Sequence, residues 1–153
     1  MSKAVLISIQ PKWCNLIANG KKTIEVRKSR PKLETPFKVY IYCTLGNPKN
    51  PHELLEIHSP NGKIRKANGK VIGEFVCDEI EELKRNTVFN APALYSQSCL
   101  TRDEYFAYIG NKIAYIWHIS DLAVYDKPKE LSDFNLKKPP QSWCYVEERD
   151  END

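Results

Sequence analysis

Hydrophobic and polar residues alternate in short segments along the chain, and these segments are typical of β-strands. Residues 4–9 place Val5, Ile7 and Ile9 on one face of a predicted strand. Residues 23–27 alternate strictly between polar and apolar side chains, and a fully apolar strand is predicted over 38–43. Three further strands are predicted, at residues 70–77, 114–125 and 142–146.

A helix is predicted directly after the first strand. Pro11 suits the first turn of a helix, and Trp13, Leu16 and Ile17 then fall on one helical face. Gly20 ends this helix, because glycine adopts the left-handed conformation of a helix terminus without steric cost. The shared face predicts that Trp13 belongs to the core.

A second helix and two tight turns are indicated further along the chain. Thr101 and Glu104 have the spacing of a capping box, which predicts a short helix through Ile109. The Asn-Gly pairs at 61–62 and 68–69 are typical of hairpin turns.

Together these elements predict an α+β fold. About six short strands, two helices and no alternation of parallel strands with helices favour a small mixed β-barrel, closed or nearly closed, with short helices on its openings. The 153 residues are enough for one domain with a real core. We expect this domain to span residues 1–146 and to be followed by a frayed acidic tail, residues 147–153.

The composition indicates a globular protein of the cell interior. No apolar run approaches the roughly 20 residues of a membrane span, and the N-terminus has the pattern of a strand and not of a signal peptide. The five cysteines are odd in number and scattered, which favours free thiols and a cytoplasmic location. The three histidines lack the spacing of a metal site, so we expect neither a metal nor a cofactor.

The charge is distributed unevenly. The chain carries a formal net charge of +3, but residues 1–77 carry +9 and residues 78–153 carry −6. Residues 21–38 contain seven cations against two carboxylates. Such asymmetry indicates either a polyanionic partner for the first half, with nucleic acid the leading candidate, or a merely solvated basic surface.

One short motif concentrates the candidate chemistry. In the strand at 23–27, Glu25 and Arg27 share the face opposite to Ile24 and Val26, while Lys22 can join them only from the preceding turn. A carboxylate between two cations can form a recognition site or an acid–base site, because arginine matches phosphates and base edges with its planar fork. The alternative is an ion-pair cluster on a solvated sheet face.

The motif Gly20-x-Lys22-x-x-Glu25-x-Arg27 resembles the GxKxxExR signature of the ASCH domain, a member of the PUA-like superfold. The opening ISIQPKW…LIANGKKTIEVRKSRP and the closing DLAVYDKPKEL…KPPQSWCYVEE also look like bacterial or phage ASCH proteins. The resemblance implies a small barrel whose cleft binds RNA or a modified nucleotide. It places Lys22, Glu25 and Arg27 in that cleft and assigns Gly20 to the turn that positions Lys22.

Other residues are candidates to support the same ligand. Ser8 and Gln10 end the strand beside the motif, and we expect them to add hydrogen bonds to a base. Ser142 and Trp143 follow two prolines and are expected to bind the ligand at the cleft edge, with Trp143 stacking on a base. Candidate phosphate contacts lie beside the motif and on a possible basic ribbon: Lys21, Lys28, Arg30, Lys63, Arg65 and Lys66. Solvated edge-strand cations are the alternative for the ribbon.

The sequence leaves catalysis and oligomeric state open. A metal-independent ribonuclease could use Glu25 as base while Lys22 and Arg27 stabilise phosphorane charge. One branch of the family removes acetyl groups from acetylcytidine with a threonine nucleophile, but Glu25 occupies that position here, and Thr23 is about 6–7 Å away along a strand. A protein–protein adaptor is a third alternative.

Overall fold

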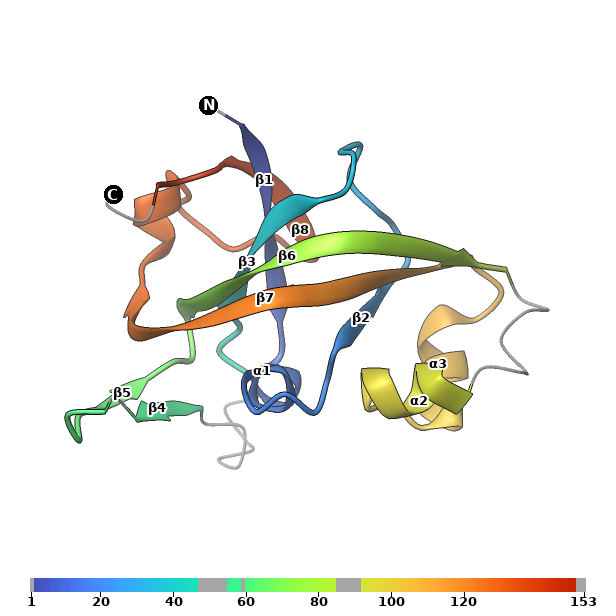
Figure 1. The fold of residues 1–153 in the computed structure, drawn as a ribbon, viewed down its shortest axis with the longest axis horizontal. Helices are drawn as coiled ribbons and strands as arrows, with labels where there is room; N and C mark the ends of the chain where they lie inside the picture. The colour runs from blue at the N-terminus through green and yellow to red at the C-terminus, as the bar shows by residue number, and fades with distance from the viewer. Residues whose placement is uncertain (1, 47–54, 59, 85–91, 151–153) are drawn as a thin grey trace.

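A six-stranded mixed sheet forms the centre of the computed structural model, which describes residues 2–46, 55–58, 60–84 and 92–150. Its strands lie in the order β2-β7-β6-β3-β1-β8, and all pairs are antiparallel except β1 with β3. The strands are β1 (Lys3–Ile9), β2 (Ile24–Arg27), β3 (Phe37–Cys43), β6 (Lys70–Leu83), β7 (Ala114–Lys129) and β8 (Trp143–Glu147). Figure 1 shows β6 and β7 running the length of the molecule.

Short helices and a separate hairpin complete the described fold. They are α1 (Pro11–Ala18), α2 (Pro92–Ser98), α3 (Arg102–Ile109), the 3-10 helix η3 (Leu131–Phe134), and the hairpin of β4 (Glu56–His58) and β5 (Ile64–Lys66). The predicted capping box of α3 is present, with Thr101 and Glu104 bonded reciprocally. The sequence did not predict α2, whose seven residues include few strong helix formers.

Several elements extend further than the sequence predicted. β6 continues through the acidic residues 78–82 and β7 continues to Lys129, because the two strands pair with each other over this whole length. Their register shifts at three places. The C-terminal segment was expected to fray after Val146, but residues 147–149 are held by hydrogen bonds. Glu147 belongs to β8, the Glu148 amide donates to Ser2, and the Arg149 amide donates to the Tyr40 hydroxyl. Residues 151–153 lie outside the described residues.

The fold is α+β and PUA-like, as predicted, but its sheet is not closed into a barrel. β2 and β8 are the two edges, and no backbone ladder joins them. Side chains bridge the gap instead: Arg27 of β2 donates to the carbonyl of Ser8 in β1 and to the hydroxyl of Ser142 just before β8. Hydrogen bonds of one side chain, and not a backbone ladder, therefore connect β2 to β1 and to the segment before β8.

Both faces of the sheet are covered, which explains why β1 is buried along nearly its whole length. The main core lies on one face beneath α1 and contains Val5, Ile7 and Trp117. Leu6 and its neighbours pack with η3 in a second cluster. A third cluster joins Ile24, Val26 and Ile116 to side chains of α2 and α3. Figure 1 shows these two helices lying together at one end of the sheet.

The close approach of β6 and β7 at Gly73 generates a prediction. A Cβ atom there would lie 2.5 Å from the carbonyl oxygen of Ala123 and 3.1 Å from the Cα of Val124. We expect Gly73→Ala to lower the free energy of unfolding by about 1–3 kcal/mol, as overpacking typically does, in urea denaturation. Without a clash, alanine would stabilise a strand interior by roughly 0.5–1 kcal/mol, so a gain in stability would contradict the prediction.

Candidate functional site

A pocket lies where the two edges of the open sheet approach each other. It has a volume of about 750 Å³. β1 and β2 form its floor, and α1 and α3 contribute its walls. The lining residues are Ser8, Gln10, Trp13, Lys22, Glu25, Val26, Arg27, Thr44, Leu100, Glu104, Ala107, Tyr108, Gln141 and Ser142.

The turn after α1 places Lys22 beneath this pocket. Gly20 adopts a φ of +81°, and the amides of Lys21 and Lys22 both donate to the carbonyl of Leu16. The Lys22 side chain is only 1% exposed. Its ammonium donates to the carbonyl of Ser98 at 2.7 Å and lies 3.2 Å from a Glu25 carboxylate oxygen. Lys22 therefore reaches Glu25 from the turn after Gly20 and not from within the strand, as the sequence predicted.

Glu25 lies between two cations. Its Oε1 faces Lys22, and its Oε2 accepts from Arg27 Nη2 at 2.8 Å. The side chains of Glu25 and Arg27 are 8% and 12% exposed. Arg27 also donates to the Ser8 carbonyl at 2.7 Å and to Ser142 Oγ at 3.1 Å. The three motif side chains thus converge as predicted, but as a buried, mutually paired cluster.

This pairing decides the charge state of Glu25. Burial by itself raises the pKa of the carboxyl, but the charges of Arg27 and Lys22 and their hydrogen bonds outweigh burial and hold the pKa below its ordinary value. Glu25 is therefore ionised at neutral pH. The cluster carries one net positive charge at the pocket floor.

The cluster retains hydrogen-bonding capacity toward the pocket. Each Glu25 oxygen takes one cation and keeps a lone pair, because a carboxylate oxygen has two acceptor sites. Arg27 uses Nη1 once and Nη2 twice, which leaves Nε–H and one Nη1–H without a bonded partner among the described residues. An acceptor and a donor therefore lie beside each other.

The other predicted ligand-binding residues divide into two groups. Ser8, Gln10 and Ser142 line the pocket with the motif. Trp143 does not: its indole N–H donates to Ser29 Oγ, and its ring packs against Trp117 and Tyr145. Trp13 was predicted to be core, and it both packs on the main core and lines the pocket.

The predicted phosphate contacts also divide. Lys28 is exposed, with its ammonium 4.5 Å from the ring centroid of Tyr108, a pocket residue. Lys21 is exposed beside Lys22. Arg30 donates to the carbonyls of Pro31 and Leu33 in its own loop. The basic ribbon of Lys63, Arg65 and Lys66 lies on the β4–β5 hairpin, which projects from the sheet in Figure 1 and does not line this pocket.

Sequence reasoning missed four polar residues of the pocket. Glu104 and Tyr108 come from α3, Thr44 directly follows β3, and Gln141 lies shortly before β8. The i, i+4 spacing of Glu104 and Tyr108 placed them on one helical face, but nothing in the sequence showed that this face borders the motif. Thr44 and Gln141 carried no signal beyond their positions at strand ends.

Comparison with known proteins decides the family. The ASCH domain matches residues 7–115, which is most of the chain and includes the whole motif. The chain belongs to the ASCH family. This family is generally thought to bind RNA. No curated protein matches.

Solved ASCH structures share the fold. The ASCH protein from Zymomonas mobilis is 23% identical, with a TM-score of 0.67, covering 94% of this chain and 87% of that one. A tyrosine-to-phenylalanine variant of the same protein is 22% identical, with a TM-score of 0.67 and coverages of 95% and 91%. A serine-to-alanine variant is 22% identical, with a TM-score of 0.67, covering 94% of this chain and 88% of that one. In the described part of this ASCH chain, no helix is long and apolar enough to span a bilayer.

The buried cluster predicts how stability depends on pH. Because the pKa of Glu25 is lowered in the folded state, its contribution is complete above the unfolded-state pKa and is lost as pH falls through the folded value. We expect Glu25→Gln to cost about 3–5 kcal/mol at neutral pH, since it leaves two cations buried without their anion. The difference from wild type should shrink below about pH 4.

Urea denaturation from acidic to neutral pH measures this difference, with Glu34→Gln, an exposed carboxylate, as the control. If the difference in unfolding free energy between Glu25→Gln and wild type stays constant from acidic to neutral pH, the ionised carboxylate of Glu25 does not stabilise the fold.

Proposed function

We propose that the pocket of this ASCH domain binds a nucleobase of RNA, either ordinary or modified, by its hydrogen-bonding edge. The observation that supports this is the paired acceptor and donor that Glu25 and Arg27 retain at the pocket floor. A nucleobase edge carries ring or exocyclic N–H donors next to carbonyl or ring-nitrogen acceptors. Such an edge can donate to Glu25 and accept from Arg27 at the same time.

The shape and walls of the pocket suit a planar ligand. A volume of about 750 Å³ lies within the usual range for small-ligand sites, about 300–1,000 Å³. Trp13 and Tyr108 supply aromatic surface, and stacking a base on such surface is worth about 1–3 kcal/mol. Gln10, Thr44 and Gln141 add neutral donors and acceptors at the rim.

Single-stranded or looped RNA fits this arrangement better than a duplex. A base must leave the helical stack to reach a pocket floor, and RNA-binding proteins read unstacked bases in this way. Lys21 and Lys28 are exposed close to the pocket residues Lys22 and Tyr108, where they can contact the phosphates of the chain. These contacts would supply affinity without sequence preference.

The geometry favours binding over hydrolysis as the role of the cluster. A general base works best with a pKa near the working pH, whereas two cations hold the pKa of Glu25 below its ordinary value. Lys22 is also committed to Ser98 and Glu25. The ribonuclease and amidohydrolase alternatives remain predictions from the sequence, without a specific contact that favours them.

Gln10 offers a test of the pocket that leaves the fold intact. Its side chain is exposed at the pocket rim and makes no capping bond to α1. We expect Gln10→Ala to weaken binding of labelled single-stranded RNA about threefold to tenfold, the effect of one lost hydrogen bond, in fluorescence anisotropy. Gln97→Ala on α2, an exposed glutamine outside the pocket lining, should leave affinity unchanged. Equal affinities for both variants and wild type would place the RNA elsewhere.

The phosphate contacts predict a salt dependence. Binding should weaken steeply as salt rises, and removing two cations that contact phosphates should lower the slope of log K against log salt by about 2. We expect this of the double variant Lys21→Ala/Lys28→Ala. The matched double variant Lys63→Ala/Lys66→Ala, on the β4–β5 hairpin, should retain the wild-type slope. If the hairpin variant changes the slope and the first does not, RNA follows the hairpin and not the pocket.

A further inference from the structure

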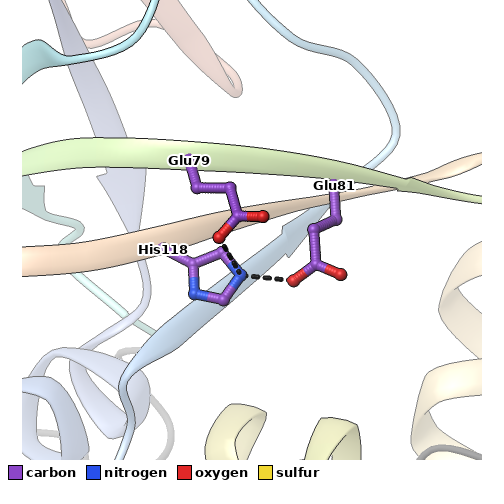
Figure 2. Close-up of side chains that lie close together, drawn as sticks. All are labelled: Glu79, Glu81 and His118. Atoms are coloured by element: carbon purple, nitrogen blue, oxygen red, sulfur yellow. Dashed lines mark hydrogen bonds and ion pairs between the residues drawn. The ribbon is translucent and has the colours of Figure 1, made fainter.

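Two carboxylates and an imidazole meet on the strands β6 and β7, away from the pocket. Figure 2 shows Glu79 and Glu81 of β6 with His118 of β7. His118 Nε2 lies 2.5 Å from Glu81 Oε1 and 3.9 Å from Glu79 Oε2. One ligand atom of each residue lies within 4.8 Å of the others.

A register shift between the strands produces this arrangement. Cys77 pairs with Ile119 and Ile80 pairs with Trp117, so β6 contains one more residue than β7 across this stretch. Glu79 therefore lies next to His118, and Glu81, two residues further, points to the same side of the sheet. Spacing along the sequence gave no metal signal, because the donors come from strands nearly 40 residues apart (His118 and Glu81 are separated by 37).

We propose that Glu79, Glu81 and His118 form a binding site for a divalent transition-metal ion, with Zn²⁺ the ion best matched to its donors. Zn²⁺ binds histidine nitrogen and carboxylate oxygen at about 2.0–2.2 Å. Tetrahedral geometry at that distance separates ligand atoms by roughly 3.3 Å. The observed separations of 2.5 and 3.9 Å lie on either side of this value.

The environment of the cluster suits an exchangeable ion. The three side chains are 27–60% exposed, so the carboxylates can rotate to meet an ion and water can complete its coordination. Among the described residues, neither Glu79 nor Glu81 forms an ion pair with a lysine or arginine. A divalent cation would balance the two negative charges and would link β6 to β7.

The cluster is independent of the proposed RNA pocket. Side chains alternate between the faces of a strand, and Trp117 of β7 pairs with Glu25 while His118 pairs with Ile24. Trp117 belongs to the main core and Ile24 to the cluster beneath α2 and α3. The metal site therefore lies on the opposite face of the sheet from the motif carboxylate and shares no side chain with the pocket.

Calorimetric titration of the full chain with Zn²⁺ tests the proposal. We expect one saturable site in wild type, and at least a tenfold loss of affinity in each of His118→Ala, Glu79→Gln and Glu81→Gln. His58→Ala and Glu82→Gln should bind as wild type. His58 is a matched control because it faces one carboxylate, Glu56, at 3.8 Å and belongs to no three-ligand group in the described chain.

Two further measurements keep the result unambiguous. Circular dichroism without metal should show all variants folded; if His118→Ala is not, the two glutamine variants carry the test. Co²⁺ bound in place of Zn²⁺ should lack the intense absorption of a thiolate ligand. No Zn²⁺ binding, affinity unchanged in all three variants, or a thiolate absorption band would each overturn the proposal.

Discussion

The structure depends on one buried carboxylate that must be matched by opposite charge. Glu25 is 8% exposed, and an unpaired charge at that depth costs several kcal/mol. Lys22 and Arg27 provide the match, and each is held in turn by backbone carbonyls, Ser98 for Lys22 and Ser8 for Arg27. The contacts of this cluster therefore fix the turn after α1, the end of α2, and the two edges of the sheet relative to one another. The cluster of Lys22, Glu25 and Arg27 therefore has a structural role as well as a place at the pocket floor.

That double role shapes what the site can do. A ligand entering the pocket finds charges already oriented by the fold, so it need not order them on binding. The same hydrogen bonds restrict chemistry: a carboxylate held by two cations accepts a hydrogen bond readily but takes a proton poorly. Recognition of a donor–acceptor edge uses the cluster as it stands, whereas acid–base catalysis would require one of its ion pairs to open. This geometry supports the proposed role in binding more than a role in catalysis.

Local patterns predicted the strand faces of the site but not their surroundings. The period of two placed Ile24 and Val26 against Glu25 and Arg27 correctly, and Gly20 placed Lys22. The burial of the polar face was not predictable, because much of it comes from α3 and the segment before β8, which are far from β2 in the sequence. The open sheet was missed for the same reason, since whether β2 and β8 pair depends on how segments more than 100 residues apart in the sequence meet. Helical periodicity assigned Trp13 to the core alone, although a ring at the edge of that face can contact both core and pocket.

β7 carries His118 of the proposed metal site and pairs with β2, the strand that carries Glu25 of the pocket, which raises the question of whether the two sites are coupled. Trp117 and His118 are neighbours that point to opposite faces, and they pair with Glu25 and Ile24 of β2. Coupling of two ligands requires an element with two arrangements that each ligand favours differently. β7 is held by hydrogen-bonded ladders to β2 on one side and β6 on the other, and the indole N–H of Trp117 donates to the carbonyl of Ser29. A strand fixed in this way offers one arrangement to both ligands. RNA in the pocket and a metal ion on the opposite face should therefore bind without influencing each other.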